Sequence, residues 1–202
     1  MVTDDLIKSF LTHDEELWLS WYQSRDYTPD EFAEVLKKLV EIPTNNIYYS
    51  QALNLRAYIY YHGYGVAFDS ELALGLFDQA VKLKNKNALY HRALIYYSGE
   101  FGSKDTAKAI ELLDEAVKLK HSKAIYLRAN MYRQGEGQDV DLEMAISLLQ
   151  EAILLGNDEA MNSLGYFYSH GIGVPCDYQM ALDLFNQAIT INPSNAQAFT
   201  NI

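Results

Sequence analysis

The chain has 202 residues with 27 acidic and 16 basic side chains, which leaves a formal net charge of −11. This balance, without any basic run, argues against a nucleic-acid partner, because phosphate binding needs clustered Lys and Arg. Cys176 is the only cysteine in the sequence, so an intramolecular disulfide is excluded and a cytoplasmic protein is expected. No signal peptide and no run of about 18 apolar residues is visible, so we expect no membrane insertion.

Residues 1–48 are predicted to form an N-terminal helical cap. One amphipathic helix is expected from about Asp4 to Tyr22. A second helix opens at Thr28-Pro29-Asp30-Glu31, which has the pattern of a capping box with proline at the first helical position, and it runs to about Glu41. A cap would cover the apolar end of a repeat array. The alternative for this segment is a separate docking site.

From residue 49 to 193 the chain matches itself at a shift of 36 residues without gaps, which predicts a repeat architecture. Each unit predicts two helices, helix A near 51–62 and helix B near 70–84 in the first copy. The recurring positions, in chain order, are Ala52, Ala88, Ala124, Ala160; Tyr60, Tyr96, Tyr132, Tyr168; Gly63, Gly99, Gly135, Gly171; Asp69, Asp105, Asp141, Asp177; and Ala73, Ala109, Ala145, Ala181.

Two of these recurring positions predict helix ends. The glycine of the Gly63 position follows helix A, where a left-handed C′ residue is favoured because glycine has no Cβ to clash. The aspartate of the Asp69 position is predicted to be the N-cap of helix B, with its carboxylate accepting a backbone N–H of the first turn. The Tyr60 position is assigned to the core.

The fourth copy reads Ala160-x3-Leu164-Gly165-x2-Tyr168-x2-Gly171-x-Gly173-Val174-x2-Asp177-x3-Ala181-x3-Phe185-x2-Ala188, and it resembles the Sel1-like repeat, a relative of the tetratricopeptide repeat. The resemblance implies an all-α fold, a right-handed superhelical α/α solenoid of 36-residue hairpins. It covers four repeats within residues 49–193, and residues 194–202 are expected to form part of a fifth repeat. It also implies a scaffold for protein contacts, with regulatory scaffolds, bacterial effectors and virulence proteins as typical settings.

The sequence departs from the family pattern at two places. Phe101 stands where the other copies have Gly65, Gly137 and Gly173, so we expect a differently built turn in the second repeat. The second departure is a row of arginines, Arg56, Arg92 and Arg128, at the position where the fourth copy has Leu164.

The copies with arginine also carry acids on helix B, namely Asp78, Asp114 with Glu115, and Glu151. We therefore predict an ion pair between helices A and B of one repeat, such as Arg56 with Asp78. The alternative is a solvated arginine whose aliphatic stem packs against the helix.

No residue pattern predicts an enzyme, a metal site or a cofactor. His62 and His170 share a repeat position but lie three repeats apart, roughly 30 Å if successive helices are about 10 Å apart, so they cannot share an ion. His91 and His121 occupy other positions and are interpreted as polar residues near helix ends. Cys176 precedes the Asp177 cap without a motif that would pair it with a base.

The remaining face of helix A is predicted to line a concave groove that is rich in tyrosine, a residue enriched at protein interfaces. The partner-binding residues predicted there are Asn54, Tyr58, Tyr61, His62, Tyr90, Leu94, Tyr97, Tyr126, Asn130, Arg133, Asn162, Tyr166 and His170. The alternative is that these rings pack sideways within the array.

The sequence favours an adaptor or scaffold that binds another protein or a peptide in this groove. If the chain is a bacterial effector, delivery into a host cell replaces the cytoplasmic location. A targeting or regulatory domain of a larger enzyme is the main alternative, and a small-molecule or glycan site among the groove aromatics is a third.

Overall fold

A computed structural model gives the fold of the chain and describes residues 2–12, 18, 28–193 and 195. In this part of the chain there are ten helices and no strand, which confirms the predicted all-α class. None of these helices combines the length and apolarity needed to cross a membrane. The chain divides into two compact units, Met1–Arg92 and Ala93–Ile202, which we describe separately.

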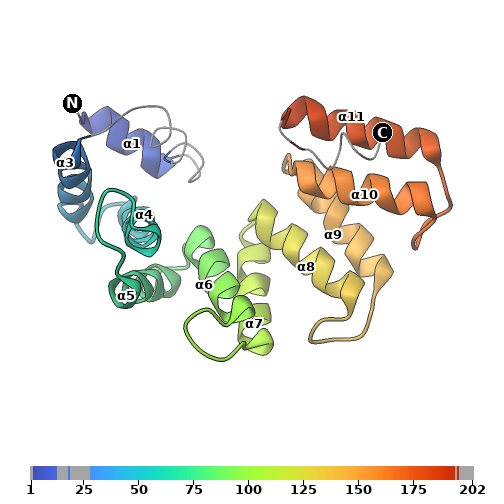
Figure 1. The fold of residues 1–202 in the computed structure, drawn as a ribbon, viewed down its shortest axis with the longest axis horizontal. Helices are drawn as coiled ribbons and strands as arrows, with labels where there is room; N and C mark the ends of the chain where they lie inside the picture. The colour runs from blue at the N-terminus through green and yellow to red at the C-terminus, as the bar shows by residue number, and fades with distance from the viewer. Residues whose placement is uncertain (1, 13–17, 19–27, 194, 196–202) are drawn as a thin grey trace. The chain divides into compact units, whose positions relative to one another are not determined.

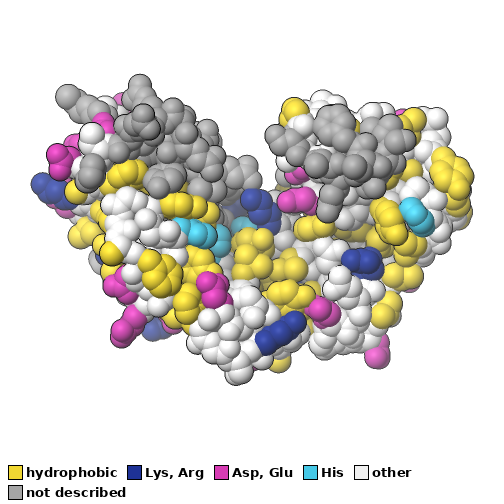
Figure 2. Space-filling view, viewed as in Figure 1, with side chains coloured by type: hydrophobic (Ala, Val, Ile, Leu, Met, Phe, Trp, Pro, Cys, Tyr) yellow, Lys and Arg dark blue, Asp and Glu magenta, His cyan; other side chains and the backbone are white. Residues whose placement is uncertain are grey.

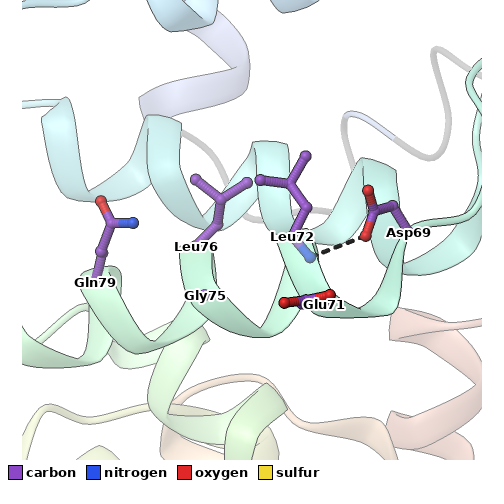
Figure 3. A pocket seen from close by; sticks show the side chains of 6 residues that line it. All are labelled: Asp69, Glu71, Leu72, Gly75, Leu76 and Gln79. Carbon is purple, nitrogen blue, oxygen red and sulfur yellow. Dashed lines mark hydrogen bonds between the residues drawn. The ribbon is translucent and has the colours of Figure 1, made fainter.

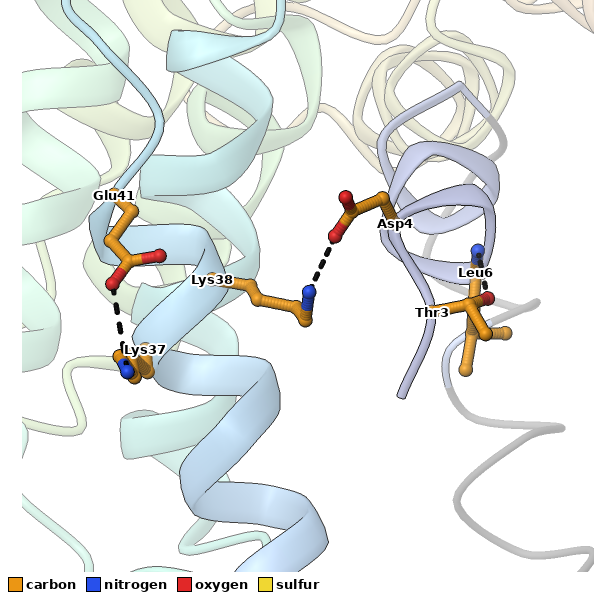
Figure 4. A network of polar contacts seen from close by, with 6 residues as sticks. All are labelled: Thr3, Asp4, Leu6, Lys37, Lys38 and Glu41. Atoms are coloured by element: carbon orange, nitrogen blue, oxygen red, sulfur yellow. Dashed lines mark hydrogen bonds and ion pairs between the residues drawn. The ribbon is translucent and has the colours of Figure 1, made fainter. Parts of the chain in front are cut away.

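The first unit contains α1 (Asp4–Thr12), α3 (Pro29–Val40), α4 (Tyr49–His62), α5 (Ser70–Lys82) and the start of α6 (Lys86–Ser98) (Figure 1). The predicted capping box opens α3, because the Glu31 N–H donates to Thr28 Oγ1 and the Thr28 N–H donates to Glu31 Oε2, both at 3.4 Å. Lys38 of α3 forms an ion pair with Asp4 of α1 (Figure 4). That carboxylate raises the pKa of Lys38.

The first two helices lie against the first repeat. α3 contacts α4, and the ring of Phe32 lies beneath the turn after α4, where a Cβ on Gly65 would be 2.2 Å from Phe32 Cγ. The role of residues 1–48 as a cap stays a prediction. Residues 13–17 and 19–22 of the predicted first helix, and most of the predicted partial fifth repeat, lie outside the described residues.

The second unit contains the rest of α6, then α7 (Thr106–Lys118), α8 (Ser122–Gln134), α9 (Leu142–Leu154), α10 (Asp158–His170) and α11 (Tyr178–Ile191) (Figure 1). Helices pair as hairpins, with α8 against α9 and α10 against α11, and α10 also packs on α9. A buried cluster that includes Ile125, Ala129, Leu149, Leu164 and Phe167 joins these helices. Apolar residues at helical spacing therefore form a core that continues from one repeat to the next.

The predicted ends of the repeat helices are confirmed. The carboxylates of Asp69, Asp105, Asp141 and Asp177 each accept the backbone N–H of the residue three positions later, at 2.9 to 3.0 Å. Helix A ends at a left-handed glycine in all four repeats, with φ of 68° at Gly63, 74° at Gly99, 71° at Gly135 and 67° at Gly171.

The turn of the second repeat differs from the others, as Phe101 predicted. Gly65, Gly137 and Gly173 have positive φ, whereas Phe101 does not. The turn closes instead by a hydrogen bond from the Gly102 N–H to the Gly99 carbonyl at 3.2 Å. A side chain with a Cβ disfavours the left-handed region, so the chain takes another path here.

Candidate functional site

The arginine row forms ion pairs, but the predicted partners were wrong. Arg92 donates from Nε to Asp78 Oδ1 at 2.6 Å, and Arg128 donates in the same way to Asp114 Oδ1 at 2.6 Å. Arg92 and Arg128 thus reach helix B of the preceding repeat, 14 residues earlier, rather than helix B of their own. The reason is geometric, because this edge of helix A faces the junction with the preceding hairpin.

The same spacing of 14 residues shows why the first and last copies of this repeat position have no such ion pair. The residue 14 positions before Arg56 is Ile42, and the one before Leu164 is Gln150. Arg56 accordingly lacks an acid at that spacing, and its Nε is buried without a hydrogen-bond partner among the described residues. An acid on one helix B therefore accompanies an arginine on the next helix A.

Arg128 lies deeper than its partner. Its side chain is 4% exposed, against 47% for that of Asp114. The guanidinium also donates from both terminal nitrogens to Gln138 Oε1 at 3.3 Å and lies 4.6 Å from the Tyr132 ring centroid. These contacts compensate for desolvation of the charge, which identifies Arg128 as a structural residue of the repeat junction.

In the first unit, the aromatic residues predicted for the groove belong to a cluster that contains two histidines. The Tyr58 ring lies 4.4 Å from His62 and 5.2 Å from His91, measured between centroids. His62 stacks on Tyr64 at 5.0 Å with 22° between the planes, and Tyr61 lies 4.8 Å from His62. Tyr58 is buried, whereas His62 is exposed, so the outward surface of this cluster is formed around His62.

In the second unit, Tyr97 connects two successive repeats. Its hydroxyl donates to the Glu136 carboxylate, and the Lys104 ammonium lies 4.2 Å from its ring centroid. The hydrogen bond to Glu136, with burial as a smaller cause, raises the pKa of Tyr97 from 10.0 to about 12. The ring therefore has a set orientation between a cation and a carboxylate.

Two further tyrosines of the second unit lie on helices α8 and α10. Ser163 of α10 donates to the Tyr126 hydroxyl of α8 at 3.4 Å. The Tyr166 ring, 41% exposed, lies 4.1 Å from the exposed His170 ring. His170 Nδ1 is also 2.8 Å from Ser169 Oγ. These contacts are local, and they leave the Tyr166–His170 pair at the surface.

The structure divides the predicted site residues by exposure. Asn54, Tyr58 and Asn162 are buried, so these side chains do not contribute to an exposed contact surface. The half-buried ones are Tyr61, Tyr90, Leu94, Tyr97, Tyr126, Asn130 and Arg133, and the exposed ones are His62, Tyr166 and His170. Their role in binding a partner stays a prediction.

Five residues that the sequence reasoning did not select contact the predicted site residues, namely Tyr64, His91, Lys104, Glu136 and Ser163. His91 and Ser163 occupy one repeat position, where the other copies have Leu55 and Leu127. A polar residue at an otherwise apolar position was the available signal, and each of the two contacts a tyrosine of the preceding helix A. Glu136 and Lys104 lie in turns and had no such signal.

His121 and Cys176, which the sequence analysis also considered, have structural contacts. His121 is the buried N-cap of α8, since its Nδ1 accepts the Ala124 N–H at 3.1 Å, as expected for a residue at a helix end. The exposed Cys176 donates from Sγ to the Ser169 carbonyl at 3.4 Å, and a hydrogen bond with Cys176 raises the pKa of Tyr178. Across the described residues, no three His, Cys, Asp or Glu side chains are grouped to hold a metal ion.

A shallow depression of about 330 Å³ runs along α5 and is lined by Asp69, Glu71, Leu72, Gly75, Leu76 and Gln79 (Figure 3). Asp69 is the helix cap and bonds the Leu72 N–H at 2.9 Å. A Cβ on Gly75 would meet nothing within 4 Å, so the space above this residue is open. The depression is a surface feature of α5 and its N-cap.

The fold is similar to several solved structures. A Sel1 repeat protein from Oxalobacter formigenes matches with a TM-score of 0.75 and 25% identity, over 83% of this chain and 67% of that one. The protective antigen c5321 of uropathogenic Escherichia coli matches with a TM-score of 0.69 and 21% identity, over 94% of this chain and 41% of that one. An immunity protein of Pseudomonas aeruginosa matches with a TM-score of 0.64 and 18% identity, over 95% of this chain and 68% of that one.

A comparison with curated protein sequences finds no match. The family model of the Sel1 repeat matches four consecutive segments, residues 50–85, 86–121, 122–157 and 158–191. Sel1 repeats typically form non-catalytic scaffolds that mediate contacts between proteins. The matches cover most of the sequence and agree with the helical hairpins described above, so the chain belongs to the Sel1 repeat family.

Proposed function

We propose that this chain is an adaptor that binds a partner protein or peptide through the tyrosine-bearing surfaces of its A helices. The observation that carries the proposal is that Tyr97 and Tyr126 are held by side chains of the following repeat, Glu136 and Ser163. Tyrosines with set orientations offer apolar area and a hydroxyl at little entropic cost on binding. Exposed Tyr166 and His170 extend this surface in the second unit.

The chemistry of these surfaces favours a polypeptide ligand. Arg133 and Asn130 of α8 are half-buried and can donate hydrogen bonds, and Asn130 can also accept from a backbone N–H. The first unit has a comparable surface around His62, Tyr61 and Tyr64. An effector role and a cytoplasmic location remain predictions that rest on the family resemblance and the sequence.

The proposal can be tested with the double variant Tyr126→Ala/Tyr166→Ala in the full chain. The wild-type chain is used to capture binding proteins from a lysate of the source organism, and the captured proteins are identified by mass spectrometry. We expect the double variant to lose them while the cooperative thermal transition is kept, because Tyr166 is 41% exposed and Tyr126 is half-buried.

Leu154→Ala is the matched control, since Leu154 is 86% exposed in the same unit and lies on a B helix. The control is expected to capture the same proteins as the wild type. Retention of every captured protein by the tyrosine double variant would contradict the proposed surface.

A further inference from the structure

In the first unit, α5 and its two ends carry a row of residues at the surface, which we call the α5 stripe and which consists of Phe68, Leu72, Gly75, Gln79 and Leu83. Phe68 is 57%, Leu72 39% and Leu83 51% exposed. Gly75 and Gln79 are exposed as well. Leu72, Gly75 and Gln79 follow one another at the spacing of one helix face. The space-filling view shows hydrophobic and acidic side chains together at the surface over α5 (Figure 2).

Gly75 stands in the middle of this stripe, between Leu72 and Gln79 (Figure 3). A glycine inside a helix destabilises it relative to alanine, because glycine loses more backbone freedom on folding. Packing within the described part of the chain does not require a glycine here, since an added Cβ would meet nothing within 4 Å. The glycine does permit the backbone of another helix to approach the depression closely.

Charges of opposite sign lie at the two ends of the stripe. Asp69 and Glu71 are exposed at the start of α5, and Lys82 and Lys84 are exposed at its end. Glu71, Lys82 and Lys84 form no ion pair with any of the described residues. Asp78, which lies between the two ends, is already paired with an arginine of α6. A stripe with acids at one end and lysines at the other is complementary to itself when it is reversed.

The other B helices in the described part of the chain lack this pattern. In α7, lysines replace the first two apolar residues of the stripe, Lys104 and Lys108. In α9 and α11 no lysine stands at the positions that correspond to the end of α5, which are occupied by Leu154, Gly156, Thr190 and Asn192. The combination of apolar residues, a central glycine and opposite charges therefore distinguishes α5.

We propose that the α5 stripe binds the same stripe of a second copy of this chain, with the two helices antiparallel and Gly75 at the two-fold axis. Residues at equal distances before and after Gly75 then lie opposite each other in the two copies. Phe68 of one copy faces Lys82 of the other, whose aliphatic stem and ammonium group suit an aromatic ring. Glu71 faces Gln79, with Lys82 one helical turn beyond it. This self-association goes beyond the proposed adaptor function and can fail independently of it.

The experiment is sedimentation equilibrium of the full chain over a range of protein and salt concentrations. A contact along one helix is at the small end of specific interfaces, so we expect a monomer–dimer equilibrium with a Kd of roughly 10–100 μM. Leu72→Ser/Leu83→Ser should weaken the dimer by roughly tenfold or more, because its apolar contacts are lost. Met144→Ser/Leu155→Ser is the matched control at the same repeat positions of α9, where the side chains are 41% and 43% exposed, and it should dimerise like the wild type.

Charge reversal tests the antiparallel arrangement. Glu71→Lys and Lys82→Glu should each weaken the dimer severalfold, and this loss should be smaller at high salt. An equimolar mixture of the two variants should recover dimers at least as tight as those of the wild type, because each new charge then faces its opposite. A variant that had merely lost its fold would not be rescued by mixing.

Gly75→Ala tests the position of the axis. It should raise the melting temperature of the dilute monomer and weaken the dimer severalfold, since alanine favours the helix but keeps the two backbones apart. Tyr126→Ala/Tyr166→Ala should dimerise like the wild type, which separates this contact from the proposed A-helix surface.

A chain that stays monomeric up to about 0.5 mM would overturn the proposal and leave the stripe to another partner. A dimer that Leu72→Ser/Leu83→Ser leaves unchanged would also overturn it, since the contact would then lie elsewhere. Failure of the mixed charge variants to dimerise would exclude the antiparallel pairing, and a dimer that Gly75→Ala does not weaken would exclude Gly75 as its centre.

Discussion

Two repeat junctions in the second unit use the same position in different ways. Between α7 and α8 the junction contains the Arg128–Asp114 ion pair, while between α9 and α10 the corresponding residues are Leu164 and Gln150. Leu164 is 4% exposed and belongs to the buried core cluster. The comparison shows that in these two junctions one position holds either a charge or an apolar side chain, and the residue 14 positions earlier is an acid only where the charge is present.

Burial is the reason for this correspondence. Arg128 and Leu164 are both almost fully buried. A buried guanidinium needs a carboxylate and further acceptors, whereas a buried leucine needs only apolar neighbours. The partner residues Asp114 and Gln150 remain near solvent, where either is tolerated.

The largest effect is expected from Leu164→Arg, which places a guanidinium in the junction that lacks the acid. We expect a loss of about 3–5 kcal/mol in the free energy of unfolding, the cost of an unpaired buried charge. Adding Gln150→Asp should restore about 2 kcal/mol by recreating the pair seen at Asp114 and Arg128. Urea denaturation of the two variants measures both changes. A double variant no more stable than Leu164→Arg would show that the spacing alone does not make the pair.

A smaller loss is expected from Arg128→Ala, which breaks the junction that has the acid. We expect about 2 kcal/mol, because the contacts with Gln138 and Tyr132 are lost while Asp114 can be hydrated. Lys120→Ala is the matched control, since it removes an ion pair with Glu151 in which the lysine side chain is 65% exposed. That control should change stability by less than about 0.5 kcal/mol. Equal losses in the two variants would refute a special role for burial.

The smallest effect concerns Tyr97, which joins the second and third repeats at the surface. The unfolded chain releases this proton near pH 10 and the folded chain near pH 12. The stabilisation is therefore complete below pH 10 and is lost as the pH rises from about 10 to about 12. Its upper bound is about 2.7 kcal/mol, and partial solvation of the ring reduces the expected loss to about 1 kcal/mol.

The measurement for Tyr97 compares the unfolding free energy of the wild type and Tyr97→Phe at pH 9 and pH 11. The wild type should lose more stability than the variant between these pH values, because phenylalanine has no proton to release. Parallel losses would mean that the hydrogen bond to Glu136 is too weak in solution to hold the phenol proton.

Local interactions account for what could be predicted from the sequence. The aspartate caps, the left-handed glycines and the altered turn at Phe101 each depend on residues within about one turn of the chain. Their recurrence every 36 residues therefore predicted the helices and their ends. The partner of each arginine could not be found this way, since an acid 14 residues earlier and one 22 residues later are equally plausible without the packing of the hairpins.

The candidate site was predicted less well for the same reason. The helical period predicted tyrosines on one side of helix A, but it does not distinguish an exposed position from one that a neighbouring hairpin covers. Tyr58 is thus buried under contacts from His62 and His91, while Tyr166, at the same repeat position, remains exposed.

The sequence by itself determined the repeat, its helices and its family, because these follow from backbone preferences and a periodic apolar pattern. The tertiary structure alone decided which helix Arg92 and Arg128 bond and which tyrosines reach the surface. These properties depend on contacts between successive hairpins, where burial and the distances between charges are set by packing.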